Sequence, residues 1–235
     1  MSFFSHMDEL RKRLVIVAAG IFVAAGIAWG FMGPILALLQ DPLPKDVELF
    51  FGRPLEAFMA KLKISLFTGF VLASPITLYQ ILAFLNPAMT GKEKRFVYPS
   101  LVSGLILAAG GIIGGYLYIF PIGINWLVAQ GTDIGLNPIL LISEYVTFSA
   151  FFLLGLGLAA ETPLILLAAI KLGLVSVAQL KKNWRIVYIV ILLSAAIITP
   201  DWSPVTMVAV AGPMLVLYHF TLIFARFVKP RGATT

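Results

Sequence analysis

The chain has 235 residues, of which 60% are hydrophobic and 12% charged, and it carries a net charge of +6. Soluble domains have roughly 45–50% apolar and about 25% charged residues, so this composition excludes a water-soluble protein and indicates a single membrane domain over residues 1–235. The sequence has no cysteine and only two histidines, which excludes disulfides, thiolate chemistry and a histidine metal cluster, so we expect neither a metal nor a cofactor.

Six apolar segments are long enough, or nearly long enough, to cross a bilayer as helices. They predict an all-α membrane protein with six transmembrane helices. The fifth segment is too short for a hydrocarbon core of about 30 Å, so we expect the last two helices to thin the bilayer or to lean on neighbouring protein. The six segments are 14–38, 64–86, 96–122, 147–170, 186–199 and 205–225.

The first residues predict a helix at the membrane interface. Ser5, followed three residues later by Asp8, is typical of a helix N-cap with a capping box. Apolar side chains recur at helical spacing along the same stretch. We therefore expect an amphipathic surface helix whose apolar face comprises Phe3, Phe4, Met7, Leu10 and Leu14.

A second surface helix is expected to lead into the segment 64–86. Pro54 suits the first position of a helix, and Glu56 suits the first turn, where the helix dipole favours a carboxylate. Pro75 removes a helical hydrogen bond and predicts a kink in the segment itself. The apolar face of the surface helix comprises Leu55, Phe58, Met59 and Leu62.

The distribution of basic residues predicts the topology. The loops on the side of the N-terminus hold 13 of the 17 Lys and Arg residues. Basic residues gather in cytoplasmic loops, so we expect both termini in the cytoplasm and no nucleic-acid partner for the positive charge. The cytoplasmic loops are 1–13, 87–95, 171–185 and 226–235, and the outer loops are 39–63, 123–146 and 200–204.

Glu161 is a carboxylate within an apolar segment. Every Lys and Arg lies in a loop or at a segment end, so no cation shares its layer of the membrane. An intramembrane carboxylate is by default a functional residue, and Thr162 is a candidate partner. The alternative is a neutral carboxylic acid that donates to a backbone carbonyl freed by Pro163.

The cytoplasmic face has three acids, Asp8, Glu9 and Glu93, and a cationic ligand would dock at them. The alternative is local, because Asp8 with Lys12 and Glu9 with Arg13 stand at the i, i+4 spacing of exposed helix pairs. Spacing alone does not separate the two interpretations.

Other polar residues have structural interpretations. Asp201 in TPDWSP suits an outward turn between two short helices. His219 suits a neutral hydrogen bond between helices better than a proton relay. No phosphate-binding loop, nucleophile elbow or zinc-binding helix motif occurs, so we expect no enzyme.

Five stretches in order along the chain resemble the TatC family, the multi-spanning core subunits of the twin-arginine protein translocase. The ordered set is far more specific than any one stretch. The resemblance implies a protein that binds twin-arginine signal peptides of folded precursors, recruits TatA-like and TatB-like single-span subunits, and uses the proton motive force. The stretches are SHMDELRKRL (5–14), RPLEAF (53–58), SPITLYQILAFLNPAMTGKEKR (74–95), GLGLAAETPL around Glu161, and TPDWSPVTMVAVAGPMLVLY (199–218).

The resemblance also implies roles for single residues. Glu161 corresponds to the acid of the family's fourth helix, and Asp201 lies in its last outward turn. Relatives often carry an acid where this chain has His219, so a role drawn from that acid does not transfer. The implied signal-peptide site comprises Glu9, Arg11, Phe84, Leu85, Pro87, Glu93, Lys94 and Arg95.

The alternative function is a proton-coupled secondary transporter of a small solute, with Glu161 as the proton carrier. Such a transporter needs polar residues that converge at mid-membrane from several helices, whereas Glu161 stands almost alone. A purely structural scaffold would leave Glu161 without a purpose. We therefore expect a multi-pass protein of a bacterial or archaeal cytoplasmic membrane, in contact with lipid, that self-associates in a larger translocase complex.

Overall fold

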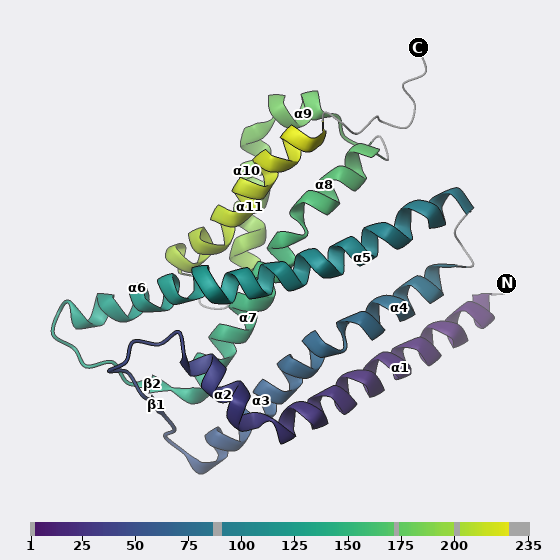
Figure 1. Ribbon diagram of the computed structural model, residues 1–235. Coiled ribbons are helices and arrows are strands. Elements are labelled where there is room, and N and C mark those ends of the chain that lie inside the picture. Colours follow the sequence, from purple (N-terminus) through teal and green to yellow (C-terminus); the bar gives the residue numbers. More distant parts are fainter. Residues whose placement is uncertain (1–2, 87–90, 172–173, 200–202, 226–235) are drawn as a thin grey trace. The chain divides into compact units, whose positions relative to one another are not determined.

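The computed structural model describes residues 3–86, 91–171, 174–199 and 203–225 (Figure 1). It confirms an all-α protein, to which one very short parallel strand pair is added. The helices are α1 (Phe3–Gly30), α2 (Met32–Gln40), α3 (Pro54–Leu72), α4 (Ser74–Leu85), α5 (Gly91–Gly114), α6 (Phe120–Thr132), α7 (Ile142–Ala160), α8 (Thr162–Lys171), α9 (Val177–Lys182), α10 (Trp184–Ile198) and α11 (Pro204–Phe224). The π-helical turn η2 (Gly115–Ile119) links α5 to α6, and the strands are β1 (Leu49–Phe50) and β2 (Leu140–Leu141).

Several helices have the length and composition of membrane spans. Among the described residues, four stretches qualify as single spans, and α3 and α4 qualify only when the pair, which is bent by 51°, is counted together as one span. The apolar helix α10 has 15 residues, about 22 Å of helix, and is shorter than the hydrocarbon core. These elements overlap the six expected segments, while the number of spans and their orientation stay predictions. The four stretches are Met7–Gly30, Val97–Thr132, Ile142–Lys171 and Pro204–Ile223.

The chain forms two compact units. The first comprises Met1–Leu105 and Ile139–Thr147, and the second comprises Ile106–Pro138 and Phe148–Thr235. Helices α5 and α7 each contribute their first part to one unit and the rest to the other. A single membrane domain remains a prediction.

In the first unit α1 and α3 approach closely because a glycine faces an alanine. A Cβ atom on Gly69 would lie 2.6 Å from the backbone nitrogen of Ala25, so a larger residue cannot fit without a shift of the helices. Small residues at a helix crossing are the usual means of close backbone approach in membranes. Figure 1 shows α1 beside α3 and α4 along its length.

The first apolar segment does not run to residue 38 as expected. Helix α1 ends at Gly30, and α2 starts at Met32 as a separate helix. Met32 is buried against Ile64 of α3 and Val146 of α7, because the apolar face of α2 turns inward rather than continuing the span. The partly buried residues around this cluster are Ile35, Leu36, Leu39 and Ile142.

The expected N-cap at Ser5 is wrong, since its backbone lies inside α1, which begins at Phe3 and continues without a break through Leu14 into the apolar span. The start of α3 at Pro54 is confirmed, with Glu56 in its first turn. The kink expected from Pro75 is also confirmed, because the bend between α3 and α4 falls at Ala73.

The second unit contains a close helix crossing at two glycines and a cluster of aromatic rings. Gly111 of α5 and Gly157 of α7 lie at a close crossing, where a Cβ on Gly111 would come within 2.6 Å of the carbonyl oxygen of Leu156. The rings of Phe120, Phe148 and Phe152 lie 5.5 to 6.1 Å apart in one cluster. Phe120 belongs to a stretch of helix that reaches Thr132, so part of the expected outer loop 123–146 is helical.

Candidate functional site

The acidic residue Glu9 lies in a hydrogen-bonded chain that joins α1 to α4. Arg13, one turn further along α1, donates from Nη2 and Nε to the same oxygen, Oε1 of Glu9, at 2.6 and 3.1 Å. Its third nitrogen, Nη1, donates to Oε1 of Gln80 on α4 at 3.1 Å. Glu9 and Arg13 are half-buried, so the guanidinium fixes the rotamer of the carboxylate.

This geometry leaves the second carboxylate oxygen of Glu9 available. Oε2 accepts no hydrogen bond from any residue that the structure describes. The local pairing expected for Glu9 and Arg13 is therefore present, and it uses only one of the two carboxylate oxygens of Glu9. Asp8 and Lys12 are exposed and form no ion pair with each other, so the second expected local pair is absent.

The other members of the implied signal-peptide site are described unevenly. Arg11 and Arg95 are exposed, and Phe84 and Lys94 are half-buried. Pro87 lies outside the described residues. The backbone of Leu85 ends α4, and that of Glu93 lies in the first turn of α5 rather than in a loop, while the side chains of both are outside the description.

Gln80 is the residue of this region that sequence reasoning missed. It is one helical turn before Phe84, within the apolar run of α4. An amide in an apolar helix is a signal in itself, because it needs a hydrogen-bond partner. Its partner, Arg13, is 67 positions away and could not be read from spacing.

Glu161 lies at a break between two helices. It forms a turn between α7, which ends at Ala160, and α8, which begins at Thr162. Pro163 has no N–H, so the carbonyl of Ala159 loses its helical donor. The hydroxyl of Thr162 donates to that carbonyl at 2.6 Å.

The hydrogen bonds at this turn bear on the alternative role expected for Glu161. A neutral Glu161 was the alternative donor to the freed carbonyl, but Thr162 already fills that role. The carboxyl group of Glu161 is half-buried and has no hydrogen-bond partner among the described residues. The carboxyl group is therefore a polar group in an apolar span, and no hydrogen bond to a described residue gives it a structural role.

Two further sequence-based expectations concern the last two helices. Asp201 lies outside the described residues. His219 of α11 forms the expected bond between helices, with Nε2 at 3.2 Å from the hydroxyl of Tyr188 on α10. The described residues contain no group of three or more His, Cys, Asp or Glu side chains that could hold a metal ion.

Comparisons with known proteins agree with one another over nearly the whole chain. The family model described as Sec-independent protein translocase protein (TatC) matches residues 5–213. A relative named Sec-independent protein translocase protein TatC, from Carboxydothermus hydrogenoformans, is 33% identical, over 98% of this chain and 95% of its own. The chloroplastic protein of Pisum sativum named TATC is also 33% identical, over 93% of this chain and 62% of its own.

The fold is similar to that of solved structures as well. A crystal structure of the twin-arginine translocase receptor TatC in detergent superposes with a TM-score of 0.78 at 32% identity. The superposition covers 94% of this chain and 99% of that chain.

Proposed function

The chain belongs to the TatC family of Sec-independent protein translocase proteins, and from that premise we propose that it is the receptor for twin-arginine signal peptides. As a member of this family it is a membrane component of twin-arginine protein translocation. The finer proposal is that folded precursors dock by their signal peptides at the cytoplasmic ends of α1, α4 and α5.

The observation that carries this proposal is the free carboxylate oxygen of Glu9. Arg13 holds the group in one rotamer through Oε1, and no described residue donates to Oε2, which can accept from an incoming donor. A guanidinium presents parallel N–H groups that match carboxylate oxygens, whereas a lysine ammonium acts as a point charge. A preformed carboxylate of this kind favours arginine ligands.

Two arginines need two acceptors. Consecutive side chains of an extended peptide point to opposite sides, so each arginine would meet a different element of the receptor. Glu9 on α1 and Glu93 at the start of α5 supply one carboxylate each on two elements of the same compact unit. The ends of these helices lie on the same side of that unit in Figure 1.

The remaining parts of the proposal rest on the family. The protein would recruit TatA-like and TatB-like single-span subunits, assemble with further copies of itself, and use the proton motive force in the cytoplasmic membrane of a bacterium or archaeon. Glu161 would be the functional polar group within the membrane, because its carboxyl group has no partner among the described residues, and Thr162 would support the turn beside it.

A proton-coupled transporter of a small solute is supported less well. Such a protein gathers polar groups from several helices around its proton carrier. In the part of the chain that is described, no side chain donates to or accepts from the carboxyl group of Glu161. The structure therefore offers no observation that favours this alternative.

The proposal is tested by the affinity of a twin-arginine signal peptide for the purified full chain. Glu9→Gln and Glu93→Gln should each weaken binding about ten- to a hundredfold, because a charge-assisted bond is replaced by a neutral one. A double-mutant cycle between each glutamate and each arginine of the peptide isolates the pairwise energies. A twin-lysine peptide should bind the parent weakly and lose little more on the variants.

Asp8→Asn is the matched control. Asp8 precedes Glu9, carries the same charge, is exposed and has no ion pair with Lys12, so its neutralisation should change affinity less than twofold. Equal losses for Asp8→Asn and Glu9→Gln would mean that only the overall charge matters. Parental affinity in both glutamine variants would place the recognition site elsewhere.

A further inference from the structure

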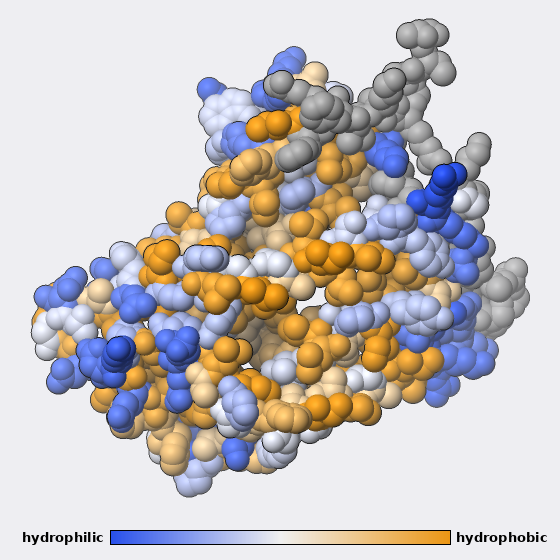
Figure 2. All heavy atoms as spheres, in the orientation of Figure 1, coloured by the Kyte–Doolittle hydropathy of each residue, from blue (hydrophilic) through white to orange (hydrophobic). Residues whose placement is uncertain are grey.

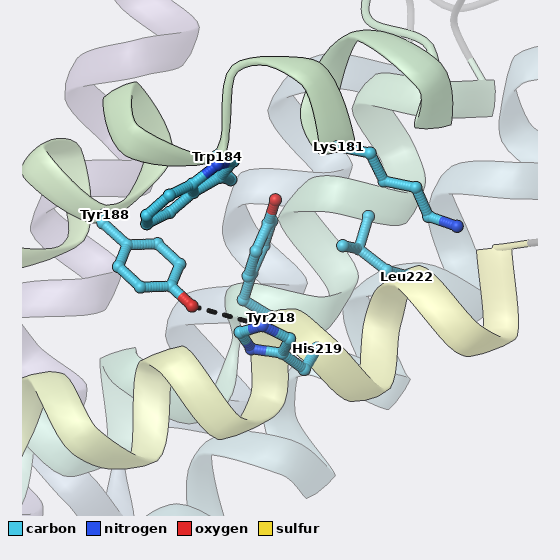
Figure 3. Close-up of a pocket in the computed structure, with 6 residues that line it drawn as sticks. All are labelled: Lys181, Trp184, Tyr188, Tyr218, His219 and Leu222. Carbon is cyan, nitrogen blue, oxygen red and sulfur yellow. Dashed lines mark hydrogen bonds between the residues drawn. The ribbon is translucent and has the colours of Figure 1, made fainter.

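The second unit contains a hollow of about 470 Å³ between the ends of α9, α10 and α11 (Figure 3). This volume falls within the range of about 300–1,000 Å³ that is usual for small-molecule sites. Figure 3 shows the rings of Trp184 and Tyr188 on one side and Lys181 and Leu222 on the other. The residues that line the hollow are Lys181, Trp184, Tyr188, Tyr218, His219 and Leu222.

Hydrogen bonds fix the orientation of three polar side chains that line the hollow, those of Tyr188, Tyr218 and His219. The carbonyl of Leu215 can only accept, so the Nδ1 of His219, 2.8 Å away, carries the proton of the neutral ring. Its Nε2 then accepts from the hydroxyl of Tyr188 at 3.2 Å. Tyr218 is buried and donates to the carbonyl of Leu180 at 3.0 Å, which holds α9 against α11.

Two donors remain unused at the rim. The ammonium of Lys181 and the indole N–H of Trp184 have no hydrogen-bond acceptor among the described residues. Helix α10 begins at Trp184 without a side-chain cap, so the positive end of its dipole lies at the same place. Arg185 stacks on the Trp184 ring at 5.5 Å and adds a second cation.

The C-terminal part of the sequence is strongly basic. From residue 162 to the C-terminus the sequence has seven Lys and Arg residues and a single acid, Asp201. Asp201 lies outside the described residues. None of the lining residues is acidic, so the hollow is suited to an anion and repels a cation.

We propose that this hollow binds the phosphate of an anionic phospholipid, with the indole N–H of Trp184 as one donor and the ammonium of Lys181, which points away from Trp184 in Figure 3, turning toward the phosphate as the second. The apolar surface next to the hollow is the reason for choosing a lipid rather than a free anion. On α10, Ile186 and Ile189 are 61% and 57% exposed, and on α11 Phe220 and Ile223 are 53% and 54% exposed. Acyl chains attached to the bound phosphate would cover these side chains.

The composition of the wall fits the depth at which phosphates lie. Trp and Tyr gather at the boundary between hydrocarbon and head groups, and lysine reaches from an apolar stem to that layer. Basic pockets between helices on the cytoplasmic side are typical sites for anionic head groups. On the predicted topology, residue 181 and its neighbours lie on that side. The site is distinct from Glu9 and does not depend on signal-peptide binding.

The test measures lipid binding to the purified full chain in detergent by native mass spectrometry. Phosphatidylglycerol should bind about tenfold more tightly than phosphatidylcholine of the same acyl chains. Lys181→Gln should reduce the affinity for phosphatidylglycerol about tenfold, because one charge-assisted bond is lost. Trp184→Phe, which keeps a ring but removes the N–H, should reduce it several-fold.

Lys182→Gln is the matched control. Lys182 is the adjacent residue of α9, is also exposed and carries the same charge, but it does not line the hollow. Its neutralisation should leave the affinity within twofold of the parent. Equal effects of the two substitutions, or equal affinity for the two lipids, would overturn the proposal. Displacement of the lipid by inorganic phosphate at equal concentration would show that the site takes a free anion, which also overturns it.

Discussion

Glu161 is followed in the sequence by a threonine and a proline, and each of the three side chains has a different effect on the turn. Pro163 takes away a backbone donor, and Thr162 replaces it by donating to the carbonyl of Ala159 at 2.6 Å. Glu161 is therefore not needed as a donor to this carbonyl. A carboxyl group kept in an apolar span without such a part is a candidate for function.

Substitutions at this turn should separate function from structure. Glu161→Gln and Glu161→Ala should both abolish export of a twin-arginine precursor while the protein accumulates normally, because the carboxyl group makes no described hydrogen bond that holds the fold. Export by Glu161→Gln at the parental rate would show that a neutral side chain suffices. Precursor export in cells and protein abundance in membranes are the two measurements.

Thr162→Val provides the matched structural change at the next position. It preserves the shape of the side chain but leaves the carbonyl of Ala159 without a donor, which should cost about 1–3 kcal/mol of stability. We expect lower thermal stability in detergent with little change in export by the protein that remains folded.

The chemical character of these residues could be predicted from the sequence more easily than the identity of their hydrogen-bond partners. The isolation of Glu161 and the spacing of Glu9 to Arg13 were both visible, because they depend on neighbours in the chain. The bond from Arg13 to Gln80 was not visible, since it joins residues that only the packing of α1 on α4 brings together. The choice of Thr162 as donor was equally hidden, because two side chains competed for one carbonyl.

At the scale of the helices, glycines set how closely two elements approach. The contact of Gly69 with Ala25 lets the backbones of α1 and α3 touch, and Gly111 does the same for α5 against α7. Membrane helices gain little from burying apolar surface, so this close packing is a main source of their association. Figure 2 shows that apolar side chains still cover much of the visible surface.

Gly69→Ala should therefore destabilise the protein. The new Cβ would lie 2.6 Å from the nitrogen of Ala25, and the resulting overpacking should cost about 1–3 kcal/mol. Gly26→Ala is the control on the facing helix, because a Cβ there meets nothing within 4 Å. Thermal unfolding in detergent should show a lower midpoint for Gly69→Ala alone. Equal midpoints for the two variants would contradict the close contact.

Helix positions followed from the apolar pattern more closely than helix ends did. Pro54 and Pro75 marked a start and a bend correctly, because proline acts through its own backbone. The apolar pattern did not predict the break after Gly30, since the residues that follow it are as apolar as those before it. They are apolar because Met32 and its neighbours pack inside the protein, and composition does not distinguish a lipid-facing residue from a buried one.

For the whole molecule, the distribution of basic residues gives a topology that chemistry can test. The chain has no cysteine, so single introduced cysteines report one position each. Cysteines at Lys45 and Gly135 should react with a membrane-impermeant thiol reagent from outside. Those at Lys92, Lys182 and Gly232 should react only after the membrane is opened. Labelling of residues 181–183 from outside in intact cells would contradict six spans with both termini in the cytoplasm.

The lysine at position 63 joins the two stretches of sequence that make up the first unit. Its ammonium donates to the hydroxyls of Ser143 and Thr147 at 2.8 and 2.9 Å. The stretch around these residues is also held by the β1–β2 pair and by a bond from the hydroxyl of Tyr145 to the carbonyl of Leu39. Sequence reasoning assigned Lys63 to an outer loop, because its acceptors are 80 positions and more away.

This arrangement imposes an order on biosynthesis. The first unit consists of residues up to 105 and of 139–147, so the ribosome makes the intervening 106–138 before the unit has all its parts. Until residues 143 and 147 emerge, the ammonium on the nascent α3 lacks these two acceptors. The contact between α3 and the start of α7 therefore forms only after residues 106–138 have been made.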